Sequence, residues 1–128
     1  MLRWLAALLC LILSGHGWTE QFVAIPMLSA RVTDLTGTLT AAQHTALESA
    51  TAAIEREKGA QVAILMLPTT QPETIEQFGI RLAEVWQIGR KGTSDGVIVI
   101  VAKDDRKMRI EVGYGLEGVI PDAVAKRI

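Results

Sequence analysis

"VIVIVAKDDRKMRIEV", residues 97–112, decides the fold, because it holds two strand patterns joined by a short polar connection. The run "VIVIVA" (97–102) is wholly apolar, which is typical of a strand buried on both faces. In "MRIEV" (108–112) apolar and charged residues alternate, which predicts a strand buried on one face. The polar "KDDRK" between them is short, so the two strands are predicted to form an antiparallel hairpin.

A capped helix and another buried strand are predicted earlier in the chain. Thr40 and Gln43 have the spacing of a capping box, and Gly59 suits the position just past a helix end. These signals predict a helix over residues 41–58. The apolar run "AQVAILML" (60–67) follows it and is typical of a strand in the middle of a sheet.

The remaining segments complete an alternating order of strands and helices. Residues 73–86 repeat apolar side chains at helical spacing, "RVTD" (31–34) suits a short edge strand, and Pro121 suits the first turn of a last helix. The predicted order is β-α-β-α-β-β-α. This order predicts the α/β class, as a three-layer α/β/α sandwich around a small mixed β-sheet.

The N-terminus has the layout of a signal peptide. Arg3 precedes the apolar run "WLAALLCLIL" (4–13), and small residues follow at 14–17. The run is shorter than the roughly 20 apolar residues that span a bilayer. We therefore expect residues 1–17 to direct export to the periplasm or the extracellular space. An uncleaved signal that anchors the protein to the membrane remains the alternative.

The rest of the chain is predicted to be a linker (18–30) and one domain (31–128). Ile128 falls about two turns into the last predicted helix, so the domain is expected to be truncated at its C-terminus. The only cysteine, Cys10, lies in the signal, which leaves no thiol chemistry in the exported part. The 13 Lys and Arg residues nearly balance the 14 Asp and Glu residues. This balance argues against nucleic acid as a partner.

Three glycines after the hairpin match the pattern G-x-G-x-x-G at Gly113, Gly115 and Gly118. A dinucleotide site needs a helix that begins within the glycines and a second parallel strand after it. Here the preceding strand is the second arm of a hairpin, and residues 119–128 are too few to complete such a unit. No NAD(P) and no other organic cofactor is therefore expected.

Acidic residues near the strand ends form the candidate site. The hairpin places Asp95, just before the strand 97–102, beside the glycine loop that contains Glu117. Asp34 is added as a candidate third ligand from the edge strand. Oxygen ligands of this kind suit a hard cation such as Ca²⁺ or Mg²⁺. The alternative, left open here, is that these acids are ordinary turn and helix-end residues.

Other residues near this edge complete the candidate set. Arg90 and Lys91 could hold an anion beside Asp95, and Tyr114 could cover a pocket or pack back on the core. The candidate metal ligands are Asp95, Asp34 and Glu117. The other candidate ligand-binding residues are Asp34, Arg90, Lys91, Gly96, Gly113, Tyr114 and Gly115. No G-x-S-x-G motif or cysteine nucleophile is present, so a serine or cysteine triad is not predicted.

Two segments resemble the TPM domain family: "RVTDLTGTLT" (31–40) and "VWQIGRKGTSDGVIVIVAKDDRKMRIEVGYGLEGVIPDA" (85–123). The resemblance extends over about residues 26–128. The family includes bacterial exported or membrane-associated proteins and plant thylakoid-lumen proteins. The resemblance implies an α/β/α sandwich. Acid phosphatase activity and divalent metal binding have been attributed to family members.

The family's positions carry over to this sequence one at a time. Asp95 and Gly96 match its Asp-Gly before the central strand, and Asp34 matches its N-terminal aspartate. Asp105 and Arg106 match its hairpin turn. Glu111, Gly113, Gly115 and Glu117 match its last strand and loop.

Three functions follow as hypotheses. The first is an exported TPM-type module that binds a divalent cation or small ligand and serves envelope-protein maintenance through an envelope or membrane protein partner. The second is a metal-assisted acid phosphatase, a phosphomonoesterase in which the cation activates water and Asp95 is the candidate catalytic residue. The third is a non-catalytic protein-interaction domain that uses the sheet edge.

Overall fold

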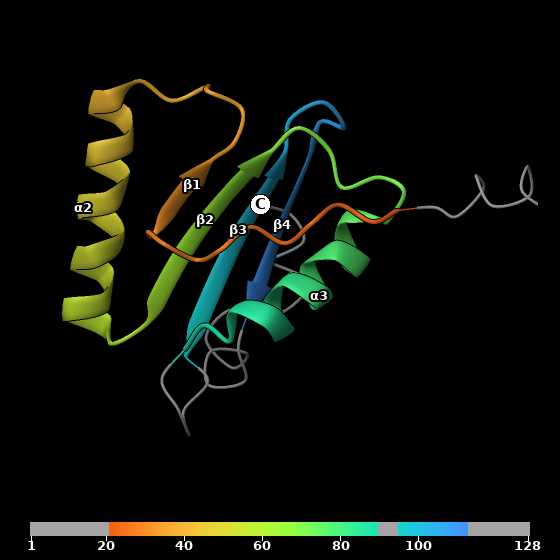
Figure 1. Ribbon diagram of the computed structural model, residues 1–128. Helices are drawn as coiled ribbons and strands as arrows, with labels where there is room; N and C mark the ends of the chain where they lie inside the picture. The colour runs from red at the N-terminus through yellow and green to blue at the C-terminus, as the bar shows by residue number, and fades with distance from the viewer. Residues whose placement is uncertain (1–20, 90–94, 113–128) are drawn as a thin grey trace, which may run out of the picture.

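The computed structural model describes residues 21–89 and 95–112. Within them lies a four-stranded mixed sheet with two helices, an α/β fold as predicted (Figure 1). The elements are β1 (Val32–Asp34), α2 (Ala41–Lys58), β2 (Gln61–Leu67), α3 (Ile75–Trp86), β3 (Gly96–Ala102) and β4 (Lys107–Val112). The last predicted helix falls on residues outside the described ranges, so the three-layer arrangement stays a prediction.

The sheet has the strand order β1-β2-β3-β4. β1, β2 and β3 are parallel, and β4 is antiparallel to β3, so the predicted hairpin is confirmed. Parallel neighbours need a crossover connection, and α2 and α3 supply the two crossovers. No helix within the described ranges is long and apolar enough to cross a membrane.

The capping signals place α2 where the sequence predicts it. The Thr40 hydroxyl accepts a hydrogen bond from Gln43 N at 3.1 Å, and the Gln43 side chain accepts one from Thr40 N at 2.9 Å. Gly59 ends the helix with φ +76°, which costs glycine little. Two α2 side chains hold the short strand β1. Glu48 accepts from Val32 N, and His44 Nε2 lies 3.0 Å from Val32 O.

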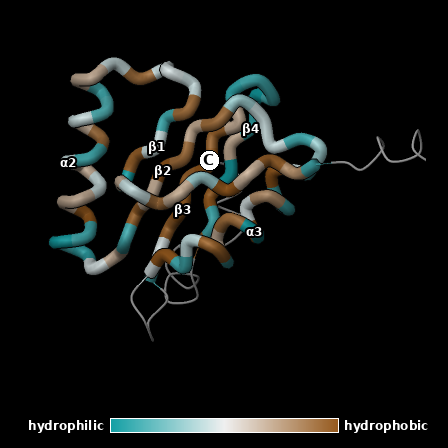
Figure 2. The backbone as a smooth tube through the Cα atoms, viewed as in Figure 1, coloured by the Kyte–Doolittle hydropathy of each residue, from teal (hydrophilic) through white to brown (hydrophobic). Residues whose placement is uncertain are grey.

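The core lies where α3 covers the sheet. Phe78 and Leu82 of α3 are fully buried, and they pack with Leu65 of β2 and Ile100 of β3. Figure 2 shows the apolar residues concentrated along the central strands and on α3. Thr74 begins this helix through a second capping box with Gln77. Trp86 is buried at its end, since only 7% of its surface is exposed.

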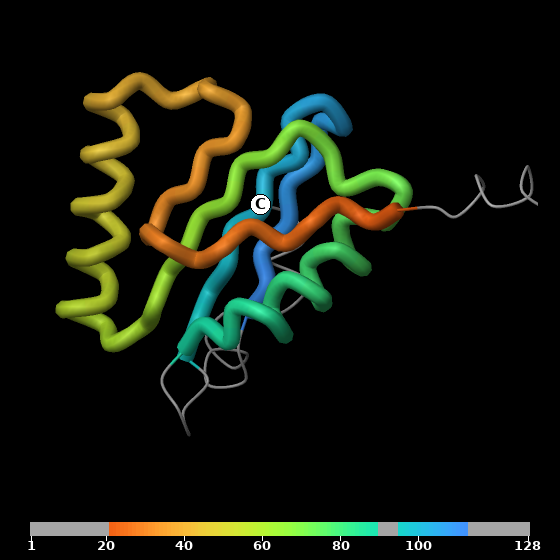
Figure 3. Tube along the Cα trace, viewed as in Figure 1, coloured from red at the N-terminus to blue at the C-terminus, as the bar shows by residue number. Residues whose placement is uncertain are grey.

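Residues 21–30, the crossing segment, pass over the sheet before β1 begins (Figure 3). Arg81 Nη2 donates to Val23 O at 2.5 Å, and Trp86 Nε1 donates to Pro26 O at 2.8 Å. Val23 and Ile25 pack against the core. Residues 21–30 therefore pack on the domain, because α3 supplies both apolar surface and hydrogen-bond donors, and the boundary between linker and domain stays a prediction. Residues 18–20 lie outside the described ranges.

The charged side of β4 is the side that faces α3. Glu111 and Arg109 lie opposite Ile98 and Ile100, which are core residues. The two charged side chains pair with each other and are only 16% and 17% exposed. They fit beneath α3 because Gly79 has no side chain, since a Cβ there would lie 2.5 Å from Glu111 Oε1. The predicted alternation is present, but α3 covers its polar half.

Replacing Ile25 by alanine tests the packing of the crossing segment. We expect Ile25→Ala to lower the free energy of unfolding by about 1–2 kcal/mol, because the side chain is half-buried against the core. Met27→Ala is the control, since Met27 is 85% exposed and its change should stay within about 0.5 kcal/mol. Chemical denaturation measures both. Equal, negligible effects would mean that the segment behaves as a linker.

Candidate functional site

The register of the β3–β4 hairpin places Asp95 at the end of the sheet where β4 stops. Val97 pairs with Val112, so Asp95 precedes β3 at the edge where β4 ends. Only 8% of the surface of Asp95 is exposed. Its carbonyl oxygen accepts a hydrogen bond from Gln61 N at 3.1 Å, which fixes its position relative to β2. The sheet thus holds a carboxylate-bearing residue at this edge, here called the amino edge because β2 and β3 begin there.

Several predicted site residues fall outside the described ranges. These are Arg90, Lys91, Gly113, Tyr114, Gly115 and Glu117. Their approach to Asp95 stays a prediction that rests on the Val97–Val112 pair.

Asp34 and Asp95 lie at opposite ends of the parallel strands. It pairs with Met66, and Met66 pairs with Val101, near the end of β3. Asp95 is about six residues from Val101, or roughly 20 Å at ~3.3 Å per residue. The prediction that Asp34 and Asp95 share one site is therefore wrong. The physical reason is parallel pairing, which separates the end of one strand from the start of its neighbours.

The Asp34 carboxylate organises the loop between β1 and α2. One oxygen accepts hydrogen bonds from Thr36 N at 2.9 Å and from the Thr36 hydroxyl at 2.5 Å. The other accepts from Leu39 N at 2.8 Å. Burial alone would raise the pKa of Asp34, but hydrogen bonds from Leu39, Thr36 and Thr38 outweigh it and lower the pKa from 3.8 to about 2.

Asp105 has a similar structural role in the β3–β4 turn. Its two oxygens accept from the Thr69 hydroxyl at 2.9 and 2.8 Å, from Thr70 N at 3.2 Å and from Gln71 Nε2 at 3.2 Å. These bonds tie the turn to the loop that follows β2. Within residues 21–89 and 95–112, no group of three or more His, Cys, Asp or Glu side chains is placed to hold a metal ion.

Gly96, a predicted ligand-binding residue, has a packing role. A Cβ at this position would collide with the carbonyl group of Ile88. The backbone that follows α3 therefore passes directly over the start of β3. Close backbone approach accounts for the glycine at this position, and a ligand-binding role for Gly96 stays a prediction.

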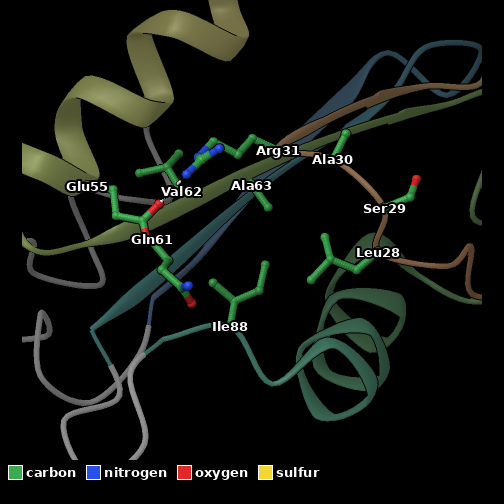
Figure 4. A pocket seen from close by; sticks show the side chains of 9 residues that line it. All are labelled: Leu28, Ser29, Ala30, Arg31, Glu55, Gln61, Val62, Ala63 and Ile88. Carbon is green, nitrogen blue, oxygen red and sulfur yellow. Dashed lines mark hydrogen bonds and ion pairs between the residues drawn. The ribbon is translucent and has the colours of Figure 1, made fainter.

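The described residues also form a cavity at the amino edge that the sequence did not predict (Figure 4). Its volume is about 290 Å³. The lining residues are Leu28, Ser29, Ala30, Arg31, Glu55, Gln61, Val62, Ala63 and Ile88. They come from the crossing segment, α2, β2 and the residues after α3. No local sequence pattern connects segments so far apart, so only the packed structure reveals the cavity.

Polar side chains line one side of this cavity. Arg31 Nη2 donates to Glu55 Oε2 at 2.7 Å, and Gly89 N donates to Gln61 Oε1 at 2.8 Å. The hydrogen bond from Arg31, with a smaller contribution from the Gln61 side chain, lowers the pKa of Glu55. Leu28 and Ile88 form the apolar side opposite them (Figure 4).

The hydrogen bonds of Asp34 predict a pH-dependent contribution to stability. Asp34→Asn should lower the free energy of unfolding at pH 7 by about 1 kcal/mol, because charge-assisted bonds are lost. A lowered pKa stabilises the folded state above the ordinary value of 3.8, and this stabilisation is lost as pH falls toward about 2. Denaturation of both proteins at a series of pH values should show the difference shrinking over that interval. A difference independent of pH would contradict the assignment.

The close approach at Gly96 predicts unequal effects of two glycine substitutions. Gly96→Ala should cost at least about 2 kcal/mol, because the neighbouring Ile88 backbone cannot move easily. Gly79→Ala should cost less than about 1 kcal/mol, since it displaces only the end of the Glu111 side chain and gains helix propensity. Thermal and chemical denaturation of both variants measure the difference. Equal costs would refute the packing role of Gly96.

Comparisons with known proteins agree with this architecture. The first similar solved structure is the solution NMR structure of the N-terminal domain of a protein from P. gingivalis. It is 35% identical, with a TM-score of 0.69, and the match covers 77% of this chain and 64% of that one. The chain therefore spans just under two thirds of that structure's length.

A second solution NMR structure shares the fold alone. It is the N-terminal domain of the cg2496 protein from Corynebacterium glutamicum, at 15% identity and a TM-score of 0.59. That match covers 84% of this chain and 79% of the other. No curated protein matches the sequence. The sequence profile of the TPM domain matches residues 32–128, which include every strand and helix described above. The chain therefore belongs to the TPM domain family.

Proposed function

We propose that this protein is an exported TPM-domain binding module that takes a divalent cation or small ligand at its amino edge. The site would use the Asp95 carboxylate together with residues 113–117. The observation that supports the proposal is the Val97–Val112 pair, which puts Asp95 at the end of the sheet where β4 stops and residue 113 follows.

The chemistry of this edge favours a hard cation. The Asp95 carboxylate is one oxygen donor at this edge. Glycine-loop carbonyls and the Glu117 carboxylate are oxygen donors of the kind that Ca²⁺ and Mg²⁺ prefer. The Asp34 and Asp105 carboxylates lie at the other end of the strands. Asp95 is the candidate among these aspartates because it precedes β3 at the end of the sheet where β4 stops.

The site of action would be outside the cytoplasm. Residues 1–17 have the sequence layout of an export signal. The partner would be an envelope or membrane protein, and the role would be maintenance of such proteins. The near balance of charge gives no reason to expect nucleic acid.

Calcium titration followed by thermal melting tests the cation site. Ligand at about 100 times its dissociation constant stabilises a folded protein by about 2.7 kcal/mol, so the melting temperature should rise by several degrees. Asp95→Asn should abolish most of this rise. Asp104→Asn should retain it, because Asp104 is an exposed acid in the turn at the opposite edge. Magnesium in place of calcium distinguishes the two cations.

The same variants separate the binding module from its alternatives. Equal shifts in the wild type, Asp95→Asn and Asp104→Asn would exclude a cation site at Asp95. No shift in any of them would favour a purely protein-binding domain. Hydrolysis of p-nitrophenyl phosphate that is lost in Asp95→Ala and retained in Asp104→Ala would replace the binding module by a phosphomonoesterase.

A further inference from the structure

The pairing of β1 with β2 leaves a gap at the start of β2. The pairs begin at Val32 and Ile64, whereas β2 and β3 pair along their whole length from Gln61 and Gly96. Arg31 O still accepts from Ile64 N, but the crossing segment before Arg31 turns away from the line of β1 (Figure 1). Residues 61–63 therefore have a β3 partner on one side and no β1 partner on the other. The cavity of about 290 Å³ lies at this gap.

Main-chain groups of β2 point into the gap. Ile64 N donates to Arg31 O at 2.7 Å, and Leu35 N donates to Met66 O at 2.8 Å. These bonds show that the even-numbered residues of β2 direct their N–H and C=O groups toward β1. Val62 belongs to the same series, because successive residues of a strand alternate in direction. Its N–H and C=O groups therefore face the cavity, and the gap is about 10 Å long.

The walls of the cavity suit a neutral ligand with an apolar side chain. Arg31 and Glu55 pair with each other at 2.7 Å, so the charge at this side of the cavity is balanced (Figure 4). Leu28, Ala63 and Ile88 offer apolar surface. The paired guanidinium and carboxylate offer no unbalanced charge to a charged ligand, and an uncharged main chain leaves the ion pair intact.

We propose that this gap binds an extended, uncharged peptide segment of a partner protein. The segment continues the line of β1, forms main-chain hydrogen bonds with Val62, and places an apolar side chain against Leu28 and Ile88. Addition of a strand at an open sheet edge is a common mode of peptide recognition. The inference is independent of the proposed cation site, because it uses neither Asp95 nor the glycine loop.

NMR titration with a blocked tripeptide, acetyl-Val-Thr-Val-amide, tests the proposal. We expect saturable shifts of the backbone amides of Val62, Ala63 and Leu28, with a dissociation constant of about 1 mM for so short a probe. The same peptide with its central amide N-methylated should bind at least about tenfold more weakly, because it cannot donate the main-chain hydrogen bond. Equal binding of both peptides would overturn the strand-addition geometry.

A pair of exposed leucines provides matched protein variants. Leu28 lines the cavity and is 42% exposed, whereas Leu35 follows β1 at the opposite edge and is 53% exposed. Leu28→Asp should abolish the peptide response, and Leu35→Asp should leave it unchanged. Equal responses of the two variants, shifts confined to β4, or no shift up to about 10 mM peptide would each overturn the proposal.

The same experiments keep the two sites distinguishable. Leu28→Asp should retain any calcium-induced rise in melting temperature, because the residue lies outside the proposed cation site. Asp95→Asn should retain the peptide response. Loss of the peptide response in Asp95→Asn, with the fold intact, would contradict the independence of the two sites.

Discussion

The parallel pairing of β2 with β3 is the constraint on which the rest of the structure depends. All seven residues of each strand are paired, from Gln61 and Gly96 to Leu67 and Ala102. This pairing carries α3 across one face of the sheet and buries the cluster around Phe78. It also fixes which residues lie at the same end of the strands. Asp95 and Gln61 meet at the amino edge, while Asp34 and Asp105 fall at the other.

The acids at the carboxyl ends of the parallel strands have a structural role. At the carboxyl ends of the parallel strands, where α/β sheets most often bind ligands, the Asp34 and Asp105 carboxylates accept hydrogen bonds from the adjacent loops. These loops are held in place by the very groups that would otherwise be candidate ligands. The amino edge combines the buried Asp95, the cavity and the start of β2, which pairs with β3 but is not reached by β1. We therefore place both proposed binding activities there.

The glycines of this fold make room for neighbouring groups. Gly79 admits the Arg109–Glu111 pair between α3 and β4, and Gly96 admits the backbone at Ile88. An ion pair beneath a helix is compatible with folding when its members satisfy each other. Because Arg109 and Glu111 face α3, Met108 lies on the other face of β4, where it is 43% exposed. The hairpin thus presents its more apolar side away from α3.

Local sequence signals determined the elements, and the long-range packing of those elements determined the site. Thr40, Gln43 and Gly59 predicted the ends of α2, and the patterns in residues 97–112 predicted the hairpin. Such signals act over a few residues, within the reach of one capping bond or one turn. The distance from Asp34 to Asp95, the docking of the crossing segment and the cavity beside Arg31 depend on contacts between segments remote in sequence. Only the register of the parallel strands and the packing of the helices against them decide those contacts.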